Sequence, residues 1–151
     1  MKWRVLSSLW AVVTCMTNTS YSTEQAKPSD AVQKLTQRSG LPEATLQGLL
    51  SHCDASQQAM YFCAWRDLLS ADAKLDKRAL LAGKADPHPV RPNATRLADW
   101  RKQRDKSCAR SAAADYAGGS MEATSRLLCM KAATEHILAQ LNQDPSRQPP
   151  P

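Results

Sequence analysis

The sequence predicts an all-α protein, a small disulfide-linked helical bundle built on a C-terminal antiparallel helical hairpin. Apolar side chains recur at steps of three and four residues along much of the chain, which is the period of a helix that buries one face. β-branched residues are few and never alternate with polar ones, so no strand is expected. Four cysteines follow the first 22 residues, and an even number in an exported chain indicates two disulfides.

Residues 1–22 are interpreted as a signal peptide. The chain starts with positive charge, residues 5–16 are mostly apolar, and Ser20 and Ser22 are small residues at the positions that a signal peptidase recognises. No later stretch approaches the roughly 20 apolar residues of a membrane helix. The mature protein is therefore expected to be periplasmic or secreted, with no membrane span. Lipid anchoring through Cys15 is a less favoured alternative, because a smaller residue than Thr14 is expected before a lipid-bearing cysteine.

The composition argues against nucleic-acid binding and against a metal site. The formal net charge of +6 falls by two when Lys2 and Arg4 leave with the signal. Basic residues are mixed with acidic ones, which is typical of solvated helix faces, and a nucleic-acid interface would need a denser basic stripe with interleaved aromatic residues. There is no C-x-x-C pair and the three histidines are scattered, so neither a metal nor another cofactor is expected.

Residues 23–40 are expected to be a polar lead-in that contains one short helix. Ser29 can cap this helix, which runs to Arg38 and is ended by Gly40. The domain proper is expected over residues 41–142.

The domain begins with a second short helix, in which Pro42 suits the first turn and which reaches Leu50. Residues 52–56 form a turn, where Asp54 or Ser56 can cap the next helix.

The third helix has the clearest pattern and is expected to be closed by Gly83. Residues 86–92 contain three prolines and are predicted to be a connecting loop. The apolar stripe of the helix comprises Met60, Ala64, Leu68, Ala71, Leu75, Ala79 and Ala82.

Two further helices are predicted to form the hairpin. The first runs from about Ala94 to Tyr116, Gly118 and Gly119 break it, and Ser120 can cap the second. Residues 143–151 are predicted to be a proline-rich disordered tail. The second helix carries an apolar stripe of Leu127, Met130, Thr134, Ile137 and Leu141.

The hairpin predicts one disulfide. Cys108 and Cys129 lie at equal distances in sequence from the midpoint of the glycine pair, so both should lie at the same height, roughly 15 Å from the turn. Cys53 and Cys63 then remain as the second pair. They are too far apart within one straight helix to bond, so Cys53 must lie in the turn and fold back. Four cysteines allow three connectivities, and the sequence does not exclude the other two.

These residues resemble the family named for the N-terminal domain of LprI, a mycobacterial lysozyme-inhibitor lipoprotein. The similarity extends from about Cys53 to Leu141. Its specific part is the W-x-x-x-R-D-x-x-C run, matched by Trp100, Arg104, Asp105 and Cys108. Residues 116–120, Cys129, residues 134–135 and Leu141 follow this run at the expected spacing. The first half matches more loosely, at residues 63–64, 71–72 and 75–76.

The chain departs from the family pattern at three points. Ile137 stands where an arginine is usual, Leu68 stands near a usual tyrosine, and the spacing from Cys53 to Cys63 is slightly short. The resemblance implies a small helical, disulfide-linked domain of the cell envelope. Lysozyme inhibition is implied through the family's name.

Trp100, Arg104 and Asp105 form the candidate partner-binding group. In one interpretation Trp100 is an exposed anchor and Arg104 offers a bidentate cation to a partner's carboxylate. In the other, Trp100 packs in the core, Arg104 covers it, and Arg101 pairs with Asp105 one helical turn away. The second interpretation is favoured.

The predicted function is binding, and no catalytic residue is assigned, because no nucleophile is accompanied by a base in a recognisable arrangement. The leading hypothesis is a periplasmic or secreted inhibitor whose protein partner is a lysozyme-type muramidase. The alternative is an accessory or adaptor protein of the envelope, with an unknown protein partner and no inhibitory activity.

Overall fold

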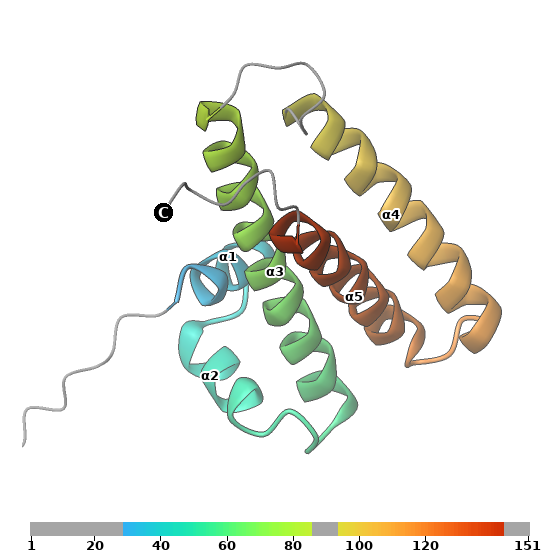
Figure 1. Cartoon of the computed structure of the whole chain (residues 1–151). Coiled ribbons are helices and arrows are strands. Elements are labelled where there is room, and N and C mark those ends of the chain that lie inside the picture. Colours follow the sequence, from blue (N-terminus) through green and yellow to red (C-terminus); the bar gives the residue numbers. More distant parts are fainter. Residues whose placement is uncertain (1–28, 86–93, 144–151) are drawn as a thin grey trace, which may run out of the picture.

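The computed structural model describes residues 29–85 and 94–143, and these residues form five α-helices (Figure 1). The helices are α1 (Asp30–Ser39), α2 (Glu43–Ser51), α3 (Gln57–Ala85), α4 (Ala94–Tyr116) and α5 (Glu122–Gln143). The described residues contain no strand, so the all-α prediction is confirmed. The expected signal peptide, Cys15, the proline-containing loop and nearly all of the expected tail lie outside the described residues.

The ends of the short helices follow from single residues. The Ser29 hydroxyl accepts a hydrogen bond from the Val32 N–H (3.4 Å) at the start of α1. Gly40 ends α1 in the left-handed conformation (φ 69°), and its N–H donates to the Thr36 carbonyl (3.0 Å). Pro42 directly precedes α2, as its fixed φ favours. Both short helices therefore form where the sequence predicts them.

Two predicted helix ends differ in detail. The Ser56 hydroxyl caps α3 by accepting from the Ala59 N–H (3.0 Å), but α3 continues past Gly83 to Ala85. A glycine inside a helix costs only about 1 kcal/mol, which a long packed helix tolerates. The last helix begins at Glu122, so Met121 and not Ser120 occupies the capping position, and the Met121 carbonyl accepts from the Ser125 N–H (2.9 Å).

Helix α3 is the axis of the bundle. On one side it packs against α1 and α2, through an apolar cluster that includes Leu35, Leu46, Phe62 and Leu69. On another side it packs against α5, which lies between α3 and α4 in Figure 1 and contacts both. The second cluster joins these helices and consists of Ala64, Leu68, Cys108, Leu127 and Met130. Tyr61 and Trp65 border both clusters.

Both expected disulfides are present. Cys108 of α4 bonds to Cys129 of α5, with their Cα atoms 5.6 Å apart. The two helices are therefore aligned about the glycine turn as expected, with both cysteines at the same height. Cys53 lies in the turn before α3 and folds back to Cys63, with a Cα separation of 5.8 Å. The two bonds fasten α4 to α5 and the α2–α3 turn to α3.

None of the helices in the described ranges 29–85 and 94–143 combines the length and the apolar character that crossing a bilayer requires.

Candidate functional site

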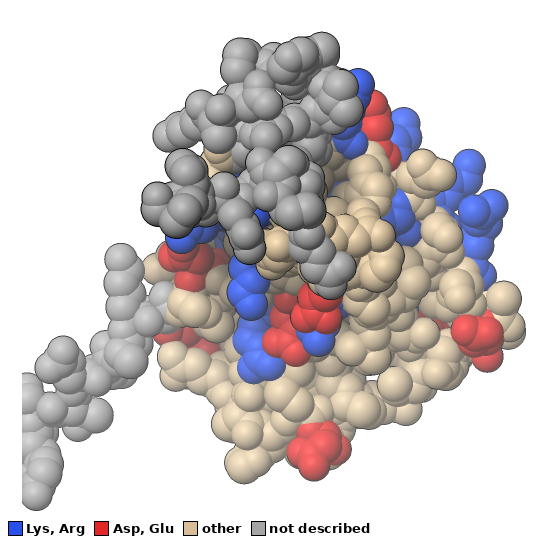
Figure 2. Space-filling model, in the orientation of Figure 1, with Lys and Arg blue, Asp and Glu red and all other residues tan. Residues whose placement is uncertain are grey.

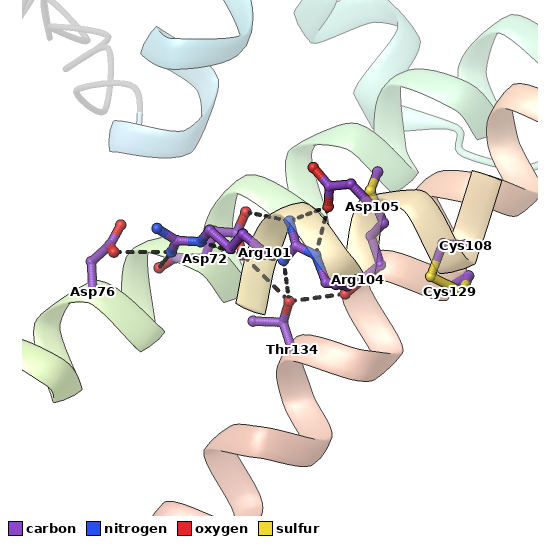
Figure 3. Close-up of polar contacts among 9 residues, drawn as sticks. Asp72, Asp76, Arg101, Arg104, Asp105, Cys108, Cys129 and Thr134 are labelled. Carbon is purple, nitrogen blue, oxygen red and sulfur yellow. Dashed lines mark hydrogen bonds and ion pairs between the residues drawn. A yellow bond between two sulfur atoms is a disulfide. The ribbon is translucent and has the colours of Figure 1, made fainter. Parts of the chain in front are cut away.

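Arg104 lies at the centre of a polar cluster that joins α3, α4 and α5 (Figure 3). Its side chain is only 4% exposed. Nη1 donates to Asp72 Oδ1 and to the Thr134 hydroxyl, at 2.6 Å in each case, and Nη2 lies 3.4 Å from Asp72 Oδ2. Nε donates to Asp105 Oδ1 at 2.8 Å. The buried guanidinium therefore has carboxylate partners on two sides.

Thr134 completes the polar contacts inside the bundle. It is fully buried, accepts from Arg104, and donates its own hydroxyl proton to the Met130 carbonyl (2.9 Å). A buried hydroxyl without partners would cost free energy, and here every role of the hydroxyl is filled. A threonine on the apolar stripe of α5 is thus explained by the arginine that faces it.

A second arginine of α4 extends the cluster along α3. Arg101 Nη2 forms an ion pair with Asp76 Oδ1 (2.9 Å) and donates to the Asp72 backbone carbonyl (3.2 Å). Its Nε lies 3.7 Å from Asp72 Oδ1. Asp72 and Asp76 are one helical turn apart on α3, and Arg101 and Arg104 are nearly one turn apart on α4, so each helix presents two charges on one face.

The charge of Arg104 is stabilised by its neighbours. Burial by itself lowers the pKa of the guanidinium, because desolvation disfavours the charged form. The hydrogen bonds and negative charges of Asp72 and Asp105 outweigh burial, and the pKa of Arg104 is raised above its ordinary value. Since the folded-state pKa is raised, this pairing stabilises the fold fully below the ordinary arginine pKa. The contribution is lost only in strong alkali, as pH rises through the folded-state value.

Trp100, Arg104 and Cys108 follow one another at intervals of one turn along the same side of α4. The Arg104 guanidinium carbon lies 5.2 Å from the centre of the half-buried Trp100 ring, within the range of a cation–π contact. Cys108 then bonds to α5. The W-x-x-x-R-D-x-x-C run thus supplies a row of side chains whose contacts attach α4 to the rest of the bundle.

The structure brings the three candidate residues together but turns Arg104 inward. Its donors are used within the protein, so it does not offer a bidentate cation to an outside carboxylate. Asp105 binds Arg104, and not Arg101 as the packed interpretation supposed, while Arg101 binds α3. Asp105 keeps a 42% exposed side chain. The packed interpretation had Arg104 covering a buried Trp100, but in the structure Arg104 is the buried residue and Trp100 is half-buried against it.

Asp72, Asp76 and Thr134 also belong to the site, although the sequence did not point to them as site residues. A signal for them existed, since all three lie in segments that resemble the family pattern. What could not be deduced was the partner of each, because the pairs are separated by about 25 to 60 residues in sequence. Residues 29–85 and 94–143 contain no group of three or more side chains that could hold a metal ion.

A groove of about 760 Å³ lies beside this cluster. Residues of α1, α3, α4, α5 and the α4–α5 turn line it, and Asp72, Arg101, Arg104 and Asp105 form part of its wall. Tyr61 and Trp65 contribute half-buried aromatic rings. Charges of both signs border it, as they do on the face shown in Figure 2, where acidic and basic side chains lie side by side near the centre.

Comparison with known proteins gives one result. Residues 52–141 match the family model described as lysozyme inhibitor LprI. The matched segment contains α3, α4, nearly all of α5 and all four bonded cysteines, whereas α1 and α2 precede it. No curated protein and no solved structure matches the chain.

Proposed function

We propose, from the premise that the chain belongs to the lysozyme inhibitor LprI family, that it is an extracytoplasmic protein that binds and inhibits a lysozyme-type muramidase. The family match carries this proposal, because it covers the whole disulfide-bonded part of the described structure. Two disulfides support a location outside the cytoplasm, since such bonds persist in oxidising compartments. The expected signal peptide is the route by which the protein reaches that location.

The outer face of α4 is the surface that we assign to the muramidase. Lys102, Lys106 and Arg110 recur at intervals of one turn, and all three are exposed. Among the described residues none of them has an ion-pair partner. A helix of this kind is a convex ridge that carries three free cations on one line.

This ridge suits the chemistry of a muramidase cleft. Such enzymes cleave glycan with a pair of carboxyl groups that face each other across the substrate. A lysine or arginine that enters the cleft can pair with these groups and exclude the glycan. Many lysozymes are themselves basic, so attraction at long range is weak, and the affinity must come from contacts made at short range.

The test measures lysis and binding separately. The protein starting at residue 23 is added to a suspension of bacterial cell walls with lysozyme, and the turbidity is followed. Direct binding to immobilised lysozyme is measured in parallel. We expect slower lysis at micromolar excess of the protein, and binding that accounts for it.

The variant Lys102→Glu/Lys106→Glu should weaken binding to lysozyme about a hundredfold, because two favourable charge contacts become repulsive. Its matched control is Lys34→Glu/Arg38→Glu, an exposed pair of the same spacing on α1 with the same change in net charge. Unchanged lysis at micromolar excess would refute inhibition and leave the adaptor hypothesis. Equal effects of the two variants would refute the assignment to α4.

A further inference from the structure

The groove beside the polar cluster has one wall that is absent from the matched family segment. Lys34 and Arg38 of α1 line it, and α1 ends before residue 52, where the family match begins. The apolar residues of α1 and α2 pack firmly against α3, with Leu35 and Leu46 fully buried. The N-terminal helices therefore add a fixed cationic wall to a face that the family segment alone leaves open.

Three cations on this groove have no ion-pair partner among the described residues. They are Lys34 and Arg38 of α1 and Arg126 of α5, and all three are exposed. By contrast, Arg101 and Arg104, which also line the groove, are paired with acids. The free cations come from two helices that are far apart in sequence, so the tertiary fold assembles them. Each can bind a carboxylate without giving up an internal contact.

The remaining lining is aromatic and acidic. Tyr61 and Trp65 lie with their ring centres 5.8 Å apart and are each half-buried, so part of each ring faces the groove. Asp76 and Asp105 keep 48% and 42% of their side chains exposed. Their oxygens can accept hydrogen bonds from hydroxyl or amide groups. The volume of about 760 Å³ is within the usual range for a ligand site.

This mixture selects among ligands. A segment of acidic peptide would find the cations but offers few donors to the exposed oxygens of Asp76 and Asp105. A basic segment would meet Lys34, Arg38 and Arg126. A glycan with spaced carboxylates satisfies both sets, because its hydroxyl and amide groups donate to the acids and its carboxylates meet the cations. Its ring faces can also pack against Tyr61 and Trp65.

We propose that the groove between α1 and α4 binds a carboxylate-bearing glycan strand, in which Lys34, Arg38 and Arg126 hold the carboxylates and Trp65 packs against a sugar ring. The glycan of a bacterial cell wall has this chemistry. The proposal goes beyond inhibition of a muramidase and uses a different surface, because the groove does not include the outer face of α4.

The experiment uses the full chain from residue 23 and isothermal titration calorimetry. The probes are a soluble tetrasaccharide that contains muramic acid, the tetrasaccharide of N-acetylglucosamine, which has no carboxylate, and polyglutamate. We expect micromolar affinity for the first probe and at least about tenfold weaker affinity for the second and for the third. In a Trp100→Phe background, the fluorescence of Trp65 should change when the first probe binds.

Charge reversal locates the site. Lys34→Glu/Arg38→Glu should weaken binding of the muramic acid tetrasaccharide at least about tenfold, whereas the matched control Lys102→Glu/Lys106→Glu should leave it unchanged. Circular dichroism verifies that each variant is folded. Equal affinity for the two tetrasaccharides, an unaltered affinity in the α1 variant, or preferential binding of polyglutamate would each overturn the proposal. The α1 variant should lose glycan binding and keep lysozyme binding, and the α4 variant should lose lysozyme binding and keep glycan binding. Failure of one proposal can therefore be distinguished from failure of the other.

Discussion

Helix α3 is held on its two sides by different kinds of contact. Against α1 and α2 the contact is apolar, made by side chains such as Leu35, Leu46 and Phe62. Toward α4 and α5 an apolar cluster is also present, but Arg104 crosses from α4 to Asp72 within it. Apolar side chains of similar volume can replace one another at small cost, whereas a buried charge needs its particular partner.

This difference parallels the extent of the family match. The matched segment contains every member of the polar cluster and both disulfides, and it excludes α1 and α2. The residues on the charged side of α3 therefore lie within the matched segment. The apolar side holds two helices that precede it, and one of them, α1, supplies the cationic wall of the groove. Three substitution experiments test whether the two sides differ in the way described.

The largest effect is expected from Asp72→Ala, which leaves Arg104 buried without its main partner. The free energy of unfolding should fall by about 4 kcal/mol, as measured by chemical denaturation. Arg104→Met should cost clearly less, because it removes the buried charge, and the 22% exposed Asp72 retains contacts with Arg101. An equal or greater loss for Arg104→Met would show that a buried charge deprived of its Asp72 partner is not what makes this side sensitive.

The apolar side is tested by Leu35→Ala, which removes a fully buried side chain of α1. The expected loss is roughly 3.5 kcal/mol, from lost transfer free energy and the cavity left behind. Native-state hydrogen exchange should show α1 and α2 amides losing protection while α5 amides keep theirs. Leu35→Met conserves volume and should cost less than about 1.5 kcal/mol. Uniform loss of protection in all helices would contradict a separable N-terminal layer.

The smallest of the three effects is expected from the disulfides. Cys108→Ser/Cys129→Ser opens a link with a sequence separation of 21, and Cys53→Ser/Cys63→Ser opens one of 10. The chain-entropy relation predicts losses of about 3.4 and about 2.8 kcal/mol. Denaturation of both variants under the same conditions checks the order. A larger loss for the Cys53 and Cys63 variant would mean that the two bonds do more than restrict the unfolded chain.

The helices were predictable because their signals are local. Ser29 and Gly40 mark the ends of α1, and the steps of three and four residues along residues 60–82 indicate α3. Local signals were less accurate at Gly83, which a long helix can pass at small cost, and at Ser120, where the geometry of the turn sets the start of α5. The Cys108–Cys129 bond was predictable from symmetry about the glycine pair, because a tight turn fixes the register of a hairpin.

The sequence by itself thus determined the all-α class, the helix positions and the pairing of the hairpin cysteines. Only the tertiary structure decided that Arg104 points inward and that α1 places Lys34 and Arg38 beside Trp65. The physical reason is distance along the chain. Periodicity shows which side of a helix is buried, but it does not show which helix lies opposite. The partner of a charge therefore depends on how helices separated by about 30 or more residues come together.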